Sequence, residues 1–141
     1  MVKIRFARED DLYRIAEMTR DLTRHIGAFE WKVKSHLKHI KRRFASGKYI
    51  YLVAVEDEAV MGYIGAEIKS KYTAYIMKGY VEPSHRRKGV MCRLEGKLIE
   101  ILREKEVTKV DLKVFSKNQE GRATWTALNY NTVSETMRKQ I

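Results

Sequence analysis

The chain is poor in cysteine, proline and glycine: 141 residues hold one cysteine, one proline and eight glycines. One cysteine, Cys92, cannot form an internal disulfide or a cysteine-built zinc site, so nothing here favours an oxidising compartment. Cys92 is expected to be a small buried side chain in a helix. Without linker-like tracts or repeats, the length predicts one continuous domain over residues 1–141.

Long apolar runs and balancing acidic residues are also lacking. No run approaches the length of a membrane-spanning helix, and the N-terminus holds Lys3 and Arg5 and continues into a charged run from Arg8, so we expect a cytoplasmic protein without a membrane partner. With 29 Lys and Arg against 18 Asp and Glu, the formal net charge is +11, which favours an anionic ligand. The alternative is a thermophilic source, in which surface charge serves ion-pair networks.

Hydrophobic periodicity predicts a mixed α/β fold. We expect Asp10 and Asp11 to cap the first helix, Gly27 to end it and Gly47 to end the second. An antiparallel meander should come first, followed by one βαβ unit. The predicted strands are 2–6, 49–55, 59–68, 73–81, 109–115 and 133–141, and the predicted helices are 12–26, 33–44, 90–105 and 122–128.

The segment from Val81 to Val90 has the pattern of an anion-binding loop. A strand ends, a basic loop with Arg86, Arg87 and Lys88 follows, and a helix begins after Gly89. Backbone N–H groups at a helix start lack intrahelical partners and add to the helix dipole, so they can hold a diphosphate. The alternative is an ordinary basic loop that caps a helix.

This loop and the order of elements together resemble the GNAT family of N-acetyltransferases. The family signature R/QxxGxG/A follows a strand that ends in VxP. The matching residues are Val81, Pro83, Arg86 and Gly89, and the match extends to Ala7–Asp11 and to Leu128–Tyr130, which is similar to the family's LGF. The resemblance implies a single-domain GNAT acyl-CoA N-acyltransferase fold, with a mixed, mostly antiparallel sheet and about four helices.

The resemblance also implies an activity: transfer of an acetyl group from acetyl-CoA, without a metal, to a primary amine by direct attack in a ternary complex. The acceptor would be a small molecule or a protein N-terminus or lysine, with acidic acceptors among the alternatives, and both a monomer and a homodimer are compatible with the resemblance. A backbone N–H near Val81 would polarise the thioester carbonyl. The implied cofactor-binding residues are Val81, Arg86, Arg87, Lys88, Gly89, Val90, Met91 and Asn118.

Two residues depart from the family pattern. Met91 stands where the family has Gly or Ala, which places a bulky side chain beside the expected diphosphate. Trp125 stands where many members carry a tyrosine that protonates the departing thiolate, and an indole N–H is too weak an acid to replace it. These departures keep a second reading open, a non-catalytic acetyl-CoA sensor.

Attack requires a neutral amine, so a base should collect a proton. The candidate bases are Glu67, an acidic residue within an apolar strand, and Glu82, which follows the strand ending at Val81. No family motif fixes either one. A solvent-facing position for Glu67 and a surface turn for Glu82 are the alternatives, and His85 is expected to be a plain loop residue.

The second helix carries a basic run that permits another reading. Its predicted outer face consists of Lys32, Lys34, Lys38, Lys41, Arg42 and Arg43. Such a face could follow a nucleic-acid backbone or recruit an acidic acceptor. His36 and His39 are expected to belong to this solvated face, because no further metal ligand accompanies them. A basic nucleic-acid-associated module therefore stays open as an alternative to the N-acetyltransferase.

Overall fold

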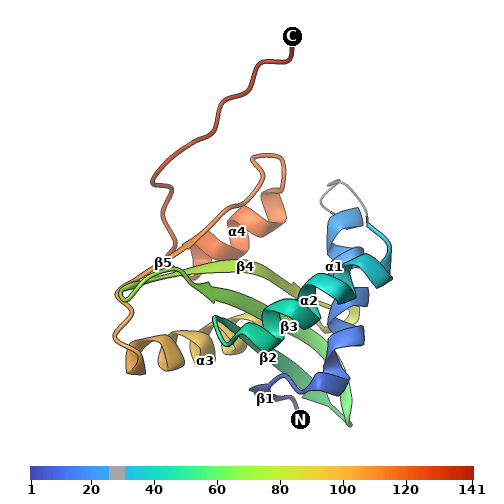
Figure 1. Ribbon diagram of the computed structural model, residues 1–141. Coiled ribbons are helices and arrows are strands. Elements are labelled where there is room, and N and C mark those ends of the chain that lie inside the picture. The colour runs from blue at the N-terminus through green and yellow to red at the C-terminus, as the bar shows by residue number, and fades with distance from the viewer. Residues whose placement is uncertain (26–30) are drawn as a thin grey trace.

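A five-stranded sheet forms the middle of the structure, with helices on both of its faces (Figure 1). The computed structural model describes residues 1–25 and 31–141. The strands are β1 (Lys3–Phe6), β2 (Tyr49–Glu56), β3 (Ala59–Ile68), β4 (Thr73–Val81) and β5 (Lys109–Leu112).

The strand order confirms the predicted meander and βαβ unit. The strands lie in the order β1-β2-β3-β4-β5; the first four pair antiparallel with their neighbours, and β4 pairs parallel with β5. Asp57 and Glu58 form the turn between β2 and β3 with φ of 51° and 65°. Two successive positive φ values match the right-handed twist of the strands, which makes this a tight hairpin.

Four α-helices cover the sheet in the described residues: α1 (Leu12–His25), α2 (Val33–Ser46), α3 (Val90–Glu104) and α4 (Gln119–Ala127). The first two pack on one face around Tyr63 and Leu12, and α3 packs on the other through Leu94 and Leu98 (Figure 1). Gly47 ends α2 with φ of 75°, as predicted. The predicted end of the first helix, at Ile26 and Gly27, lies outside the described residues. No helix in the described ranges is both long and apolar enough to cross a membrane.

Asp11 ties the start of α1 to the sheet. It closes a short 3-10 turn, Glu9–Asp11, and its carboxylate accepts the Arg8 amide at 2.7 Å instead of an amide of α1. Arg5 on β1 donates to both carboxylate oxygens, at 2.7 and 3.1 Å. Burial alone would raise the pKa of Asp11, but these hydrogen bonds outweigh burial and lower it.

The sheet opens between β4 and β5. Their ladder joins Thr73–Ile76 to Lys109–Leu112 and stops there, although β4 continues to Val81. The register between β3 and β4 shifts at Gly65/Ala66, which leaves Met77 as an extra residue on β4. The predicted strand 109–115 therefore ends at Leu112, because its last three residues have no partner strand.

The predicted strand 133–141 is wrong. Residues 131–141 form neither helix nor strand, and Val133, Met137 and Ile141 are exposed along a tail that leads away from the sheet (Figure 1). These apolar residues recur every fourth position and not every second, so no strand face could bury them. The last helix begins at Gln119 and not at 122, because the Asn118 side chain accepts the Gly121 amide at 2.9 Å and caps it.

Candidate functional site

The unpaired stretch of β4 directs backbone groups into the opening beside β5. The Glu82 amide donates to the Met61 carbonyl on β3 at 2.9 Å, so these two residues form a hydrogen-bonded pair. Because such pairs alternate with non-bonded pairs along an antiparallel ladder, the backbone groups of Gly79 and Val81 point away from β3. The Val81 amide thus faces the opening, where the resemblance requires it.

The opening leads to the start of α3, where residues 87–91 form what we call the cradle. Arg87 and Gly89 have φ of 62° and 76°, and a Cβ at Gly89 would meet nothing within 4 Å. The first amide that bonds back along the helix is that of Arg93, to the Gly89 carbonyl at 3.1 Å. The amides of Val90 and Met91 therefore point out of the helix start, and this fits a diphosphate.

Met91 turns away from the cradle. Its methyl carbon lies 2.9 Å from the point where a Cβ at Gly79 would stand, and Trp125 of α4 lies 3.5 Å from the same point. Both side chains pack against the core between α3 and the sheet. The bulky residue at position 91 thus covers Gly79 on the α3 face and leaves the cradle amides uncovered.

The basic residues of the loop have different surroundings. The Arg86 side chain donates to the Val81 carbonyl at 2.8 Å, lies 5.2 Å from the centre of the Tyr80 ring and reaches to 3.7 Å from Glu120 on α4. Arg87 and Lys88, the first two residues of the cradle, have exposed side chains. Arg86 therefore holds the end of β4 in place, while its two neighbours remain available to an anion.

Asn118 and Cys92 lie on either side of this region. The Asn118 side chain, implied to contact a pantetheine arm, already accepts the Gly121 amide as the cap of α4. Its amide nitrogen keeps donors for a further contact. Cys92 is exposed on the first turn of α3, so the prediction of a buried thiol is wrong: its neighbours Val90 and Leu94 take the inward positions.

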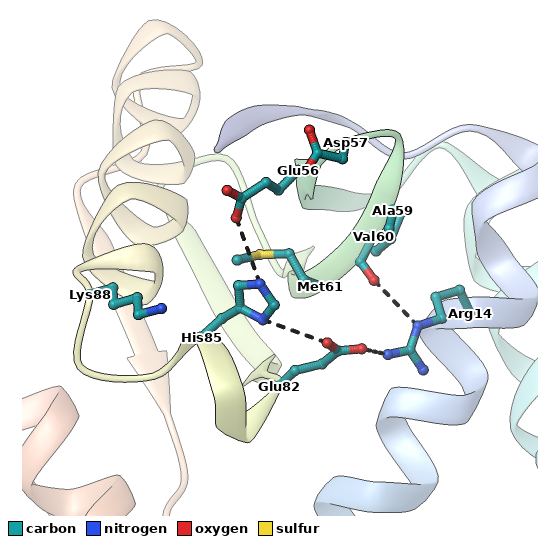
Figure 2. Close-up of a pocket in the computed structure, with 9 residues that line it drawn as sticks. All are labelled: Arg14, Glu56, Asp57, Ala59, Val60, Met61, Glu82, His85 and Lys88. Carbon is teal, nitrogen blue, oxygen red and sulfur yellow. Dashed lines mark hydrogen bonds and ion pairs between the residues drawn. The ribbon is translucent and has the colours of Figure 1, made fainter. Parts of the chain in front are cut away.

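Glu82 lines a surface pocket at the end of β4 (Figure 2). The pocket has a volume of about 650 Å³ and lies between α1, the turn of the β2–β3 hairpin and the loop before α3; His85 and Lys88 also line it. Arg14 of α1 donates to the Glu82 carboxylate and, at 3.3 Å, to the Val60 carbonyl. The carboxylate is thus fixed one residue beyond Val81.

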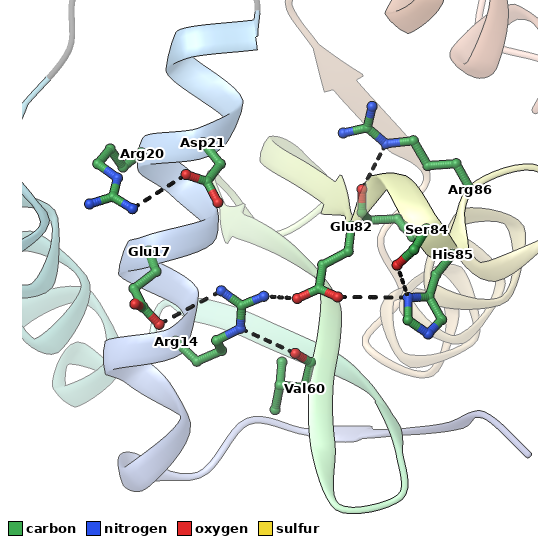
Figure 3. A network of polar contacts seen from close by, with 10 residues as sticks. Arg14, Glu17, Arg20, Asp21, Val60, Glu82, Ser84, His85 and Arg86 are labelled. Carbon is green, nitrogen blue, oxygen red and sulfur yellow. Dashed lines mark hydrogen bonds and ion pairs between the residues drawn. The ribbon is translucent and has the colours of Figure 1, made fainter.

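A network of polar contacts extends from this carboxylate along α1 and the loop (Figure 3). Glu17 lies 3.7 Å from Arg14, and His85 lies 3.7 Å from Glu82 and 3.6 Å from Glu56. His85, expected to be a plain loop residue, therefore bridges two carboxylates.

Glu67 lies toward the other end of the open stretch. It pairs with Tyr75 on β4, before the bulge, and its carboxylate lies 3.5 Å from Lys69. The two candidate bases thus flank the unpaired stretch of β4 from opposite ends, and only Glu82 lines the pocket beside the cradle.

Two site residues had no clear signal in the sequence. Arg14 reaches Glu82 across 68 positions of the chain, so only the packing of α1 on the sheet reveals the pair. Lys78 lies half-buried on β4, next to Gly79. In the sequence, Lys78 stood out only as a charged residue within an otherwise apolar strand. No group of three or more histidine, cysteine or acidic residues in the described part of the chain could hold a metal ion.

Solved structures of similar fold cover nearly the whole chain. A possible acetyltransferase from Clostridium difficile 630 superposes with a TM-score of 0.82 at 23% identity, covering 100% of this chain and 97% of that chain. The PaiA N-acetyltransferase from Thermoplasma acidophilum, in complex with coenzyme A, gives 0.81 at 20% identity, with 97% and 93% covered. An aminoglycoside 6′-N-acetyltransferase from Acinetobacter haemolyticus gives 0.84 at 19% identity, with 99% and 97% covered. Comparison with curated protein sequences finds no match.

The family model described as the acetyltransferase (GNAT) family matches residues 7–130. The matched region runs from the turn before α1 to the residues after α4, and it includes β4, the cradle and the opening between them. This agrees with the residues from which the resemblance was first drawn. The chain belongs to the acetyltransferase (GNAT) family.

Proposed function

We propose that the chain is one N-acetyltransferase domain that moves an acetyl group from acetyl-CoA to a primary amine. One observation carries the proposal: the unpaired edge of β4 runs directly into the cradle. An extended pantetheine arm could pair with the backbone groups of Gly79, while the diphosphate lies on the amides of residues 87–91.

The chain's own residues supply the elements of the chemistry. The amine nitrogen forms a bond to the thioester carbonyl carbon, the bond from that carbon to sulfur breaks, and the amine loses a proton. In this proposal the Val81 amide donates to the carbonyl oxygen as negative charge develops on it, and such a donor contributes about 3 kcal/mol to transition-state stabilisation. We favour Glu82 over Glu67 as the base, because its carboxylate lies beside Val81 and contacts His85.

Release of the CoA thiol tests the proposal. With acetyl-CoA and a panel of primary amines, we expect thiol to appear faster than in the absence of an acceptor, and mass spectrometry should find one added acetyl group on the amine. Lys41→Met, an exposed change on α2 away from β4, serves as the control and should leave the rate unchanged. Tight acetyl-CoA binding without turnover on any amine would contradict the proposal.

A second candidate, an acetyl-CoA sensor, is favoured by the side chains near Gly79. Trp125 stands at the position of the tyrosine that protonates the thiolate in many family members. Its ring contacts the Tyr130 ring edge-on, with 5.6 Å between the two centroids. The Tyr130 hydroxyl donates to Glu95 at 3.1 Å, and burial together with Glu95 raises its pKa. Neither side chain is a ready acid for a departing thiolate, so an enzyme must use water or another group.

A further inference from the structure

Four basic side chains lie near one another beneath α2, on the face of the sheet that α1 and α2 cover. We call them the basic cluster: Arg20 of α1, His36 and Arg43 of α2, and Lys78 of β4. His36 and Arg43 were expected on the solvated outer face of the second helix, and the structure contradicts both expectations. His36 is only 7% exposed, and Arg43 turns inward to the Tyr51 hydroxyl and stacks on the Tyr49 ring at 5.9 Å.

Two nitrogen atoms of the cluster, Nε2 of His36 and Nε of Arg20, are buried and have no hydrogen-bond partner among residues 1–25 and 31–141. In the described part of the chain, the Arg20 guanidinium contacts the Asp21 carboxylate, 3.5 Å from Nη2 (Figure 3), and this contact does not use Nε. Buried polar atoms are normally paired, so an unpaired set usually indicates a missing partner.

The charges of the cluster act on one another. Burial and the nearby charges of Lys78, His39 and Arg20 lower the pKa of His36. Burial and Arg43 lower the pKa of Lys78. Among the described residues, each charged group that shifts either pKa is cationic. Folding thus brings like charges together out of water, at a cost that an anion would offset.

The cluster lies next to the opening in the sheet. Lys78 directly precedes Gly79, whose backbone faces that opening, and its side chain lies on the opposite face from Met91 and Trp125. An acceptor that reaches the opening from the α1/α2 face would therefore pass the cluster.

We propose that the basic cluster binds a carboxylate or phosphate group carried by the acceptor amine, so that the preferred acceptors are anionic or zwitterionic amines. This rests on the proposed function and deepens it. It also separates this chain from the relative named for aminoglycosides, because an aminoglycoside carries several positive charges and the cluster would repel it.

Anion binding can be tested without turnover. Thermal unfolding is followed with inorganic phosphate and with chloride at equal ionic strength, in a Gly89→Asp background that removes the cradle as a competing phosphate site. We expect phosphate to raise the unfolding temperature in this background and in its Lys41→Met control. Adding Lys78→Met to the Gly89→Asp background should abolish this rise. Without phosphate, the Lys78→Met protein should unfold at the same temperature as the Gly89→Asp protein or at a higher one, because it loses a half-buried charge that repels its neighbours. His36→Gln, which replaces the imidazole with an amide that cannot carry a charge, provides a second variant.

Acceptor preference is tested with matched pairs: O-phosphoethanolamine against ethanolamine for phosphate, and β-alanine against β-alaninamide for carboxylate. We expect kcat/KM at least 10-fold higher for the anionic member of one pair, an advantage that Lys78→Met removes and Lys41→Met keeps. Kanamycin should be a poor acceptor.

Equal stabilisation by phosphate and chloride, or a phosphate effect that survives Lys78→Met and His36→Gln, would overturn the anion site. A higher kcat/KM for the neutral amine of each pair would overturn the proposed preference for anionic acceptors. Failure of the proposed function appears separately, as an absence of acetyl-CoA binding or thiol release, while the phosphate measurement still decides whether the cluster binds an anion.

Discussion

The cradle and the basic cluster are both suited to anions, but they are built differently. The cradle consists of consecutive residues, 87–91, and its donors are backbone amides held by two positive φ values. The basic cluster consists of side chains from α1, α2 and β4, from position 20 to position 78. Most substitutions leave the donors of a backbone site in place, whereas each substitution in a side-chain site removes or moves one of its donors. Cofactor binding should therefore be robust in this fold, and acceptor preference should be easy to alter.

The largest effect is expected at Gly89. Gly89→Asp places a carboxylate in the open space of the cradle and forces a side chain onto φ of 76°. One like charge a few ångströms from the diphosphate costs about 3 kcal/mol, so we expect CoA affinity to fall about 100-fold or more by calorimetry. Gly96→Asp, the same change at an exposed position of α3, is the matched control. Equal losses of CoA affinity in Gly89→Asp and Gly96→Asp would show that the cradle does not bind the diphosphate.

The second effect concerns the base. Glu82→Gln keeps the shape of the side chain but cannot take a proton, so kcat should fall about 100-fold while CoA affinity stays the same. The pH profile of kcat/KM should also lose the limb that the base produces. Glu67→Gln is the matched comparison on β3. A large loss for Glu67→Gln with a small one for Glu82→Gln would exchange the two assignments.

Sequence patterns were sufficient for the local features of the molecule. The meander, α3 and the position of Gly89 follow from short-range periodicity and one loop, and all three are present in the structure. The family of the chain rests on the same features, and the family model confirms it.

Features that depend on packing could not be read in this way. The burial of His36, the inward turn of Arg43 and the pair of Arg14 with Glu82 depend on how α1 and α2 lie on the sheet. The predicted strand 133–141 failed for a related reason: β propensity forms a strand only where a partner and a buried face exist.

The third effect concerns the packing that keeps Met91 off the cradle. A Cβ at Gly79 would stand 2.9 Å from the end of the Met91 side chain, so Gly79→Ala should displace that flexible chain toward the opening. We expect about a 10-fold loss of CoA affinity with little loss of stability, since only the tip of one side chain must move. Met91→Ala in the same chain should restore the affinity. A double variant no better than Gly79→Ala would show that Met91 is not the obstacle.

The smallest effect is a pH dependence of stability at His36. Its folded-state pKa lies below the ordinary value, because His36 is buried and faces Lys78, His39 and Arg20, with the Trp31 ring 5.6 Å away. The unfolded chain therefore takes up a proton first, and stability should decline as pH falls from about 6.5 through the folded-state pKa. Denaturant unfolding at several pH values should show this decline in the wild type and a flatter profile in His36→Gln. His25→Gln, which removes an exposed histidine at the end of α1, serves as the control. A profile unchanged by His36→Gln would exclude His36 as its source.

Thermal unfolding of the wild-type chain with acetyl-CoA, CoA and a short RNA, each at low and high salt, tests the central claim most directly. A ligand present at 100 times its Kd adds about 2.7 kcal/mol to the stability of the folded state. The account predicts a clear rise in unfolding temperature with acetyl-CoA and with CoA. No rise with either, together with a rise in RNA that disappears in high salt, would contradict it and identify the chain as a basic nucleic-acid-binding module.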